Sequence, residues 1–362
     1  MRSPFCYLNA LEAKHYFDIP PERSIMIIFY ENLNDIDMKH FKKIINKKHW
    51  KKIFYVPKNV SSSKEKNEIK NKFLRKIISF RPLQKIINIL YYIRKLNTVI
   101  SSINNAIDKI FLQSLYEYSS LHFVNTLKPK KIYNMDEGAR ILHISQVRRE
   151  SNEKKYKFFE KEYFKKLACN YLFGYHVKDI REITYFTAYN LIVNKGDSII
   201  QNKYIKIGEK ISNNPRMPKT AFFFGTPAVE GRSMSKDIYF MYIEKAKTYL
   251  ADYDFIYIPH RGESVKNINR LKNKLGIKIF NFSMPYEFRI YTGGPIPEVI
   301  ASFSSSVLQN CYAIFGDEIK IISFYTKSKH VNKWAEKVYD YFKANSNTNF
   351  KVVDFISVKL SR

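Results

Sequence analysis

Short hydrophobic runs alternate with longer stretches of helical periodicity along most of the chain. Residues 24–30, with the sequence SIMIIFY, are typical of a buried strand, and residues 52–56 form a second such run that ends before Pro57. Between residues 66 and 126, Ile, Leu and Tyr recur at helical spacing. A further short strand is predicted at 131–135. Alternation of this kind favours an α/β architecture with largely parallel sheets.

The alternation resumes after a polar, proline-containing break at residues 212–218. The second half is predicted to contain strands at 220–224, 254–258, 278–280, 299–303 and 319–323, and helices at 237–250, 265–275 and 331–344. Residues 150–200 are charged and aromatic, and we expect helices and a short hairpin there. The break predicts two domains, residues 1–212 with a helical basic insert and residues 213–362.

The composition agrees with a packed two-domain protein. The chain has 362 residues, of which 45% are hydrophobic and 16% aromatic. Cys6, Cys169 and Cys311 lie far apart and show neither disulfide nor zinc spacing, so a reducing cytoplasm is expected. No export signal is recognisable at the N-terminus, and charged residues interrupt the apolar-rich region 83–115. That region is predicted to be an amphipathic helix rather than a membrane span.

The formal net charge of +29 predicts attraction to a polyanion or to an anionic surface. Thirteen Lys or Arg residues lie between Lys42 and Lys76, against only Glu65 and Glu68, and aromatic residues are interleaved with them. This mixture suits an anionic membrane leaflet, at about 1 kcal/mol per basic residue near the surface. The alternative is an ordinary solvated helix face.

Two acidic residues, Asp136 and Glu137, follow the predicted strand 131–135 and precede Gly138. Ligands of open parallel sheets gather at the carboxyl ends of strands. Adjacent carboxylates raise one another's pKa, which suits removal of a proton from a hydroxyl group. The pair is therefore a candidate general base, and an ordinary turn is the alternative.

A candidate phosphate site follows the predicted strand 254–258, which places His260 and Arg261 at its end. The imidazole can donate a hydrogen bond or a proton to a departing phosphate oxygen, and the guanidinium supplies a permanent charge. The alternative is that His260 caps the following helix or packs on Tyr257.

A second candidate anion site follows the predicted strand 299–303. Ser304 and Ser305 stand there at the start of a predicted helix, where unpaired N–H groups and hydroxyls attract an anion. The alternative is a simple N-cap. No metal site is predicted, because Asp35 and Asp37 lie in a polar segment that is interpreted as a loop, and the histidines show no ligand spacing.

In their order along the chain, these motifs resemble those of the bacterial sialyltransferases of glycosyltransferase family 52, which are related to the polysialyltransferases of family 38. The family has a strand with a Cys-Tyr-type turn, an acidic-acidic-Gly motif, a Gly-Ser/Thr-Pro turn, a His-Pro motif and a Ser/Thr-rich turn. The corresponding residues are Phe5-Cys6-Tyr7-Leu8, Asp136-Glu137-Gly138, Gly225-Thr226-Pro227, His260 and Ser304-Ser305. The chain departs from the family at His260, which Arg261 follows and Pro259 precedes.

The resemblance implies a GT-B fold, in which two Rossmann-like domains face each other across a cleft. It further implies inverting, metal-independent transfer of sialic acid from CMP-sialic acid to a hydroxyl of a surface glycan such as lipooligosaccharide or capsule. Asp136, or else Glu137, would deprotonate the acceptor. His260 would stabilise or protonate the phosphate of CMP, assisted by Ser304 and Ser305.

Other donor-binding residues follow from the same resemblance. Glu298 resembles the acid that holds the ribose hydroxyls of CMP, and Arg261, Gly225 and Thr226 are further candidates. Some family members carry a candidate base after the Gly-Ser/Thr-Pro turn, where this chain has Ala228 and, two residues later, Glu230. That difference favours Asp136 as the base. No cofactor is required, because a His residue and helix N–H groups can carry the charge of a monophosphate leaving group.

Several alternatives remain open at the level of sequence. The donor could be another CMP-activated acid sugar, such as Kdo or legionaminic acid, or the enzyme could be a polysialyltransferase. The expected partners are a lipid-linked or polyanionic acceptor, an anionic membrane surface and a second copy of the chain in a homodimer. The expected location is the cytoplasm, peripheral on the inner membrane. A non-enzymatic nucleic-acid-binding protein is the rival class, although no nucleic-acid motif accompanies the charge.

Overall fold

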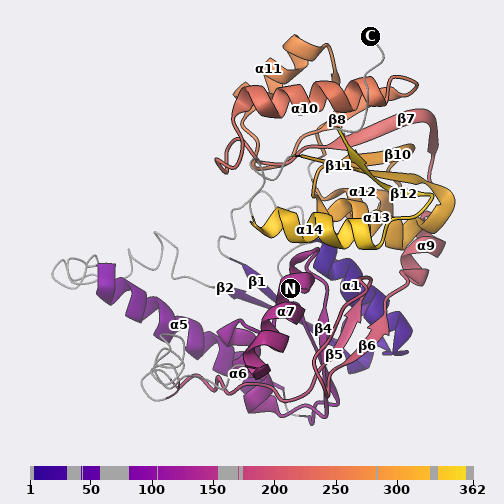
Figure 1. Cartoon of the computed structure of the whole chain (residues 1–362). Coiled ribbons are helices and arrows are strands. Elements are labelled where there is room, and N and C mark those ends of the chain that lie inside the picture. Colours follow the sequence, from indigo (N-terminus) through magenta and orange to yellow (C-terminus); the bar gives the residue numbers. More distant parts are fainter. Residues whose placement is uncertain are drawn as a thin grey trace. The chain divides into compact units, whose positions relative to one another are not determined.

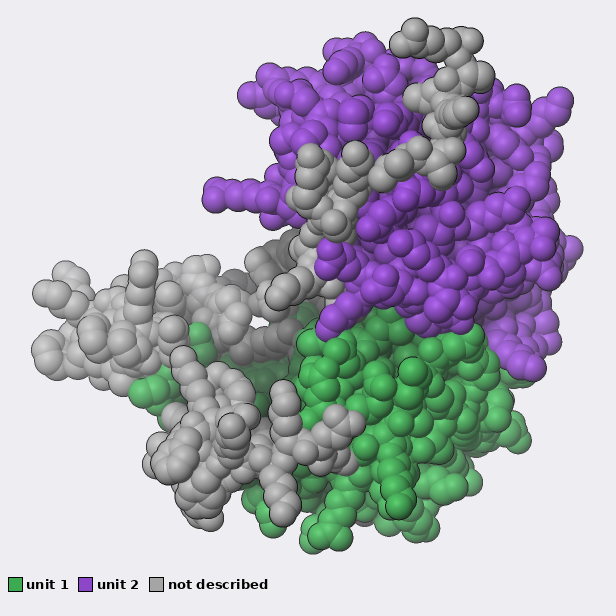
Figure 2. Space-filling model, in the orientation of Figure 1, with its two compact units in different colours: residues 1–202 green, residues 203–362 purple. Residues whose placement is uncertain are grey.

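The computed structural model describes residues 4–30, 42, 44–57, 81–103, 105–153, 170, 174–282, 284–326 and 333–355. The chain forms two compact units, unit 1 with residues 1–202 and unit 2 with residues 203–362 (Figures 1 and 2). The predicted boundary lay after residue 212. The structure assigns helix α9 (Ile205–Ile211) to unit 2 because it packs on α12 (Tyr286–Tyr291) and α13 (Ser306–Phe315) of that unit.

Unit 1 contains parallel strands in two sheets within its described part. One sheet pairs β1 (Ile25–Tyr30) with β2 (Lys52–Pro57). The other has the order β3 (Lys109–Leu112), β4 (Lys131–Met135), β5 (Thr184–Thr187) and β6 (Ser198–Gln201). The helices are α1 (Pro4–Tyr16), α5 (Arg81–Ser101), α6 (Tyr118–Leu127) and α7 (Arg140–Glu153), and short 3-10 turns occur at Pro21–Arg23 and Lys47–His49.

Three expectations for unit 1 were wrong. Residues 5–8, expected as a strand and a turn, lie in α1, where every residue from Phe5 to Ala13 is buried. A helix that is buried on all sides shows no amphipathic period. The predicted helical stretch 66–126 is interrupted by β3. This strand has only four residues, and in so short a run the spacing of hydrophobic residues cannot distinguish a strand from a helix. In place of the expected hairpin, β5 and β6 form a parallel pair. Residues 188–197 lead the chain from the end of β5 back to the level at which β5 began, so β6 runs in the same direction.

Several predictions fall outside the described residues. These are Asp35 and Asp37, Cys169, and most of the basic stretch from 42 to 76. Cys6 and Cys311 are both fully buried. No helix in the described ranges is long and apolar enough to cross a lipid bilayer.

A buried ion pair holds α7 against the end of the sheet in unit 1. Arg148 donates from Nε to Oδ2 of Asp197 at 2.6 Å and from Nη2 to Oδ1 at 2.8 Å. The side chains are 10% and 0% exposed, respectively. Arg148 also donates to the carbonyls of Ile180 and Arg181, and Asp197 accepts from the Ile183 N–H. The pair therefore positions the chain entering β5 and the chain entering β6.

Unit 2 has one parallel sheet in its described part. Its order is β12 (Phe350–Asp354), β11 (Lys320–Tyr325), β10 (Ile296–Ser302), β7 (Arg216–Phe224), β8 (Asp254–Ile258) and β9 (Lys278–Ile279). Helices α10 (Lys236–Tyr249), α11 (Val265–Leu275) and α14 (Lys333–Ala344) accompany α9, α12 and α13, with a 3-10 turn at Gly316–Glu318. The α/β class with a parallel, Rossmann-like sheet arrangement in each of two units is thus confirmed. β7 begins at Arg216, inside the predicted break.

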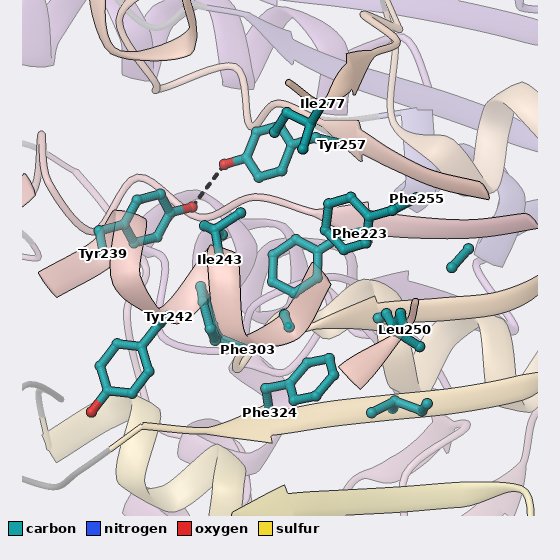
Figure 3. Close-up of a cluster of buried hydrophobic side chains, with 14 of the residues drawn as sticks. Phe223, Tyr239, Tyr242, Ile243, Leu250, Phe255, Tyr257, Ile277, Phe303 and Phe324 are labelled. Atoms are coloured by element: carbon teal, nitrogen blue, oxygen red, sulfur yellow. Dashed lines mark hydrogen bonds between the residues drawn. The ribbon is translucent and has the colours of Figure 1, made fainter. Parts of the chain in front are cut away.

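Aromatic side chains form the core between this sheet and α10 (Figure 3). Phe223 of β7 is fully buried and stacks on Tyr257 of β8 with ring centroids 5.9 Å apart. The ring of Phe303, directly after β10, packs against the ring of Phe223 in a T-shaped arrangement, with the ring centroids 5.2 Å apart. Phe222 points to the opposite face of the sheet and packs on Tyr286 of α12. Because both faces are packed, the carboxyl ends of these strands are held by a rigid core.

Candidate functional site

The carboxyl ends of β7, β8 and β10 lie at one edge of the sheet in unit 2. The Gly225 N–H donates to the Ile258 carbonyl at 2.9 Å, and the Ser302 hydroxyl donates to the Phe224 carbonyl at 2.7 Å. The predicted donor-side residues Gly225, Thr226, His260, Arg261, Ser304 and Ser305 directly follow these strands. Sequence reasoning therefore located one edge on which three polar turns meet.

A hydrogen-bonded chain that we call the tyrosine–glutamate chain connects two of these turns. The Thr226 N–H donates to the Tyr239 hydroxyl at 2.9 Å, and this hydroxyl lies 2.9 Å from that of Tyr257 (Figure 3). The Tyr257 hydroxyl donates to Oε1 of Glu263 at 2.6 Å. Oε2 of Glu263 accepts from the His260 N–H at 2.6 Å. The turn after β7 and the turn after β8 are thereby tied to the same carboxylate.

Burial raises the pKa of Glu263 to about 7, although the hydrogen bonds from Tyr257 and His260 favour its ionised form. Sequence reasoning missed this residue and both tyrosines. Glu263 follows His260 by three residues, but nothing in the sequence shows that Tyr239 of α10 reaches the same place.

Gly225 is the point of closest approach in this cluster. A Cβ atom at position 225 would overlap the Tyr257 hydroxyl and the Glu263 carboxylate. Gly225→Ala should therefore lower the free energy of unfolding by about 1–3 kcal/mol, the usual cost of overpacking. Chemical denaturation would measure it.

Gly208→Ala is the matched control, because a Cβ there meets nothing within 4 Å and the residue lies in α9. It should leave stability unchanged or raise it by about 0.5–1 kcal/mol, because Ala is the better helix former. Equal stability of the two variants would contradict the close packing around Gly225.

His260 is held in one tautomer by its own turn. Its Nδ1 accepts the Gly262 N–H at 3.0 Å, so the neutral ring carries its proton on Nε2. Burial and the nearby charge of Arg261 lower the pKa of His260, whereas Glu230 raises it. The neutral ring can donate a hydrogen bond from Nε2 to an anion. The predicted capping of the following helix is done instead by Ser264, whose hydroxyl accepts from the Asn267 N–H.

Ser305 is the N-cap of α13, and its hydroxyl accepts from the Val307 N–H at 3.4 Å. The capping alternative is thus observed, and an anion role for this serine stays a prediction. The Leu308 N–H also donates to the Ser305 carbonyl, and α13 begins after the carboxyl end of β10, at the edge of the sheet that carries His260. This arrangement is suited to an anion, since the helix dipole is positive at that end.

Glu298 does not join the other donor-side candidates. It lies near the amino end of β10, whereas Ser304 and Ser305 follow the carboxyl end. Its carboxylate accepts from the Lys219 N–H and from Lys320 Nζ, both at 3.0 Å, and these bonds lower its pKa. The geometry gives Glu298 a role in joining neighbouring strands.

Another acid, Glu287 of α12, lies against α13. It is 6% exposed, accepts from Asn310 Nδ2 at 2.7 Å, and has a pKa raised by burial. Sequence reasoning missed it, since a Glu in the first turn of a short helix is common for electrostatic reasons alone.

Glu230, the alternative base, caps the start of α11. It accepts from the Ser264 N–H at 2.7 Å and from Asn267 Nδ2 at 3.0 Å. Although burial opposes them, these hydrogen bonds leave its pKa lowered. A carboxylate with a lowered pKa is a weaker proton acceptor, which favours Asp136 for that role.

Asp136 is fully buried at the carboxyl end of β4 in unit 1. Its Oδ2 accepts from the Ala188 N–H at 2.8 Å, just beyond β5, and its main-chain carbonyl accepts from Asn9 Nδ2 at 2.9 Å. Burial raises its pKa to about 7, and the Thr187 hydroxyl and the Ala188 N–H oppose this rise. The predicted perturbation is present, but burial rather than the adjacent acid is its main cause.

Glu137 has a different environment from its neighbour. Its side chain is 23% exposed and forms an ion pair with Arg140 at 2.9 Å. Gly138 then adopts a φ of 61°, a backbone conformation that glycine reaches without strain. The two acids are therefore distinguished by burial. In the described part of the chain, no three His, Cys, Asp or Glu side chains are grouped to hold a metal ion.

No protein-family model matches the chain, and no curated protein matches it either. Among solved structures, it is similar to a protein described as a UDP-N-acetylglucosamine 2-epimerase from Listeria monocytogenes, with 11% identity, 89% of this chain and 77% of that chain covered, and a TM-score of 0.45. It is also similar to MurG from Acinetobacter baumannii, with 8% identity, coverage of 98% and 84%, and a TM-score of 0.45. LpCGTa in complex with UDP gives 10% identity, coverage of 94% and 80%, and a TM-score of 0.44. Similarity at this level assigns no activity to the chain.

Proposed function

We propose that the protein is an inverting, metal-independent glycosyltransferase of the GT-B type whose donor is a CMP-activated acid sugar, with CMP-sialic acid as the first candidate. The observation that carries the proposal is the polar edge of unit 2. There His260, with its proton on Nε2, follows β8, and the N-terminus of α13 follows β10, the two strands that flank β7 in the parallel sheet. Both kinds of group stabilise a phosphate that departs with a negative charge.

In the proposed reaction, a hydroxyl oxygen of the acceptor attacks the anomeric carbon while the bond from that carbon to the phosphate oxygen of CMP breaks. Asp136 takes the hydroxyl proton. Its pKa of about 7 suits a group that must accept a proton near neutral pH. His260 donates from Nε2 to the phosphate oxygen that receives the electron pair. In this proposal, His260 and the N-terminus of α13 meet the charge on the departing CMP.

The choice of CMP-sialic acid rests on the resemblance of the motifs. The alternatives are a CMP-activated Kdo or legionaminic acid as the donor, or transfer onto a growing polysialic acid chain. We place the enzyme on the cytoplasmic face of the inner membrane, acting on a surface glycan such as lipooligosaccharide or capsule. The net charge of +29 supports contact with anionic lipid or with a polyanionic acceptor.

CMP alone should stabilise the protein against unfolding. A ligand that binds only the native state adds about 2.7 kcal/mol at one hundred times its Kd. We therefore expect millimolar CMP to raise the melting temperature in a thermal shift assay, and His260→Ala to reduce that rise.

UDP and GDP serve as the comparison nucleotides in the same assay. If UDP raises the melting temperature and CMP does not, the assignment of the donor is contradicted. That result would not contradict glycosyl transfer as the reaction class. Release of CMP from several CMP-sugars, measured with and without glycan acceptors, then identifies the sugar. A nucleic-acid mobility shift without any CMP release would favour the non-enzymatic alternative.

A further inference from the structure

Unit 1 contains a cavity of about 240 Å³ between β1 and β3. Its wall follows β1 from Ser24 to Phe29 and β3 from Lys109 to Ser114, and side chains of α1 and α6 complete it. Five residues of strand span roughly 16 Å, so the lining extends along both strands, and we call this cavity the slot.

Apolar side chains form the middle of the slot. They include Ile25 and Ile27 of β1, Ile110 and Leu112 of β3, and Phe123 of α6. An apolar cavity of roughly 150 Å³ already accepts a benzene ring and stays dry. Side chains that face such a space lack dispersion contacts on one side, and an apolar occupant restores these contacts. The slot therefore favours an unbranched apolar chain.

The two ends of the slot carry opposite charges. Lys14, Arg23 and Lys109 line the end at which β1 and β3 begin. Lys14 Nζ donates to the Ser24 hydroxyl at 2.6 Å and lies 4.9 Å from the centroid of the Trp50 ring. Asp108 partly offsets these charges, because it is 3.5 Å from Arg23 and 2.8 Å from Lys130.

Glu117 and Glu137 line the end at which the strands finish. An anionic head group is therefore attracted at the first end and repelled at the second. The charges fix the direction in which an amphipathic chain with an anionic head would lie.

We propose that this slot binds a medium-chain fatty acid. The carboxylate lies between Lys14 and Lys109, and the hydrocarbon chain runs between β1 and β3 toward Met135. The site is independent of the proposed sugar transfer, although its far end adjoins the turn that carries Asp136 and Glu137. A bound fatty acid would therefore reach the neighbourhood of the candidate base.

Isothermal titration of the full chain with dodecanoate, below its critical micelle concentration, tests the proposal. We expect saturable binding at one site. Dodecyltrimethylammonium has the same chain with a cationic head and should bind at least tenfold more weakly, because charge-assisted contacts to lysine are lost. Acetate supplies the head group alone and should not bind measurably. Equal affinity for the cationic and anionic chains would overturn the proposal.

Variants locate the binding in the slot. Ile110→Trp fills its middle and should abolish binding of dodecanoate, whereas Ile199→Trp adds the same bulk on β6 and should have no effect. Lys109→Met should weaken binding about tenfold, whereas Lys178→Met removes a charge of unit 1 away from the slot and should not. Unchanged binding by a folded Ile110→Trp protein, verified by its circular dichroism, would place the fatty acid elsewhere and refute the site.

Discussion

Asp136→Asn should lower the turnover of the proposed sugar transfer by about 10²–10⁴-fold and leave the proposed binding of CMP unchanged, because the variant keeps the shape of the side chain but cannot accept a proton. The wild-type enzyme should gain turnover as the pH rises through the pKa of Asp136, about 7, since only the ionised carboxylate is a base. Initial rates measured with saturating donor across pH 5 to 9 would show both effects.

The neighbouring acids provide the matched controls for this variant. Glu137→Gln removes a partly exposed carboxylate and should reduce turnover much less. Glu230→Gln should affect mainly the start of α11, where this residue accepts two hydrogen bonds. Near-normal transfer by Asp136→Asn, together with loss of transfer in Glu230→Gln, would move the base to unit 2 and leave the reaction class standing.

Stability distinguishes a catalytic role of Asp136 from a structural one. Its folded pKa is raised from 3.8 to about 7, so the folded state holds the proton more tightly than the unfolded state. The tighter binding of this proton adds as much as about 4 kcal/mol to the free energy of unfolding below about pH 4. This contribution is lost as the pH rises through 7. Asp136→Asn lacks this loss, so it should be the more stable protein at pH 8 although it is the less active one.

Asp197→Ala should lower the free energy of unfolding by about 3–5 kcal/mol, because it leaves the guanidinium of Arg148 buried without its counter-charge. Because a typical domain is stable by only about 5–15 kcal/mol, unit 1 should unfold at a distinctly lower denaturant concentration. Urea unfolding of the full chain, followed by circular dichroism, would measure the change.

The exposed pair Lys278 and Asp254 in unit 2 is the control for this measurement. Its N–O distance is 2.7 Å, similar to that of the buried pair, but the side chains are 64% and 44% exposed. Asp254→Ala should cost less than about 1 kcal/mol. Equal costs for the two substitutions would show that burial does not determine the strength of the Arg148 and Asp197 pair.

The strands of unit 2 could be predicted because each is a hydrophobic run bounded by polar or turn residues. Once those strands are parallel, the residues after them must share an edge, which is why Thr226, His260 and Ser304 were placed correctly. Glu298 shows the limit of the family resemblance, which grouped it with the donor-side residues. The predicted strand at 299–303 already put Glu298 at its amino end, and β10, which begins at Ile296, keeps it near that end.

Contacts between distant segments could not be predicted. The hydroxyl of Tyr239, in the first turn of α10, reaches Thr226 and Tyr257 only because α10 packs on the face of the sheet, and no local pattern encodes that position. The burial of Asp136 likewise depends on residues far from it in the sequence, Asn9 and Ala188. Sequence patterns therefore located the acidic turn, but the difference between its two acids arises from tertiary packing.

The tyrosine–glutamate chain has a consequence for redesign of the polar edge in unit 2. The backbone amides of Thr226 and His260 are anchored, directly or through tyrosines, to the single carboxylate of Glu263. A loop grafted after β7 from another protein would meet a hydroxyl positioned for the native turn, and a loop grafted after β8 would remove the carboxylate itself. Exchanging either loop by itself should therefore disturb both, so the two turns and α10 form one module that has to be exchanged together.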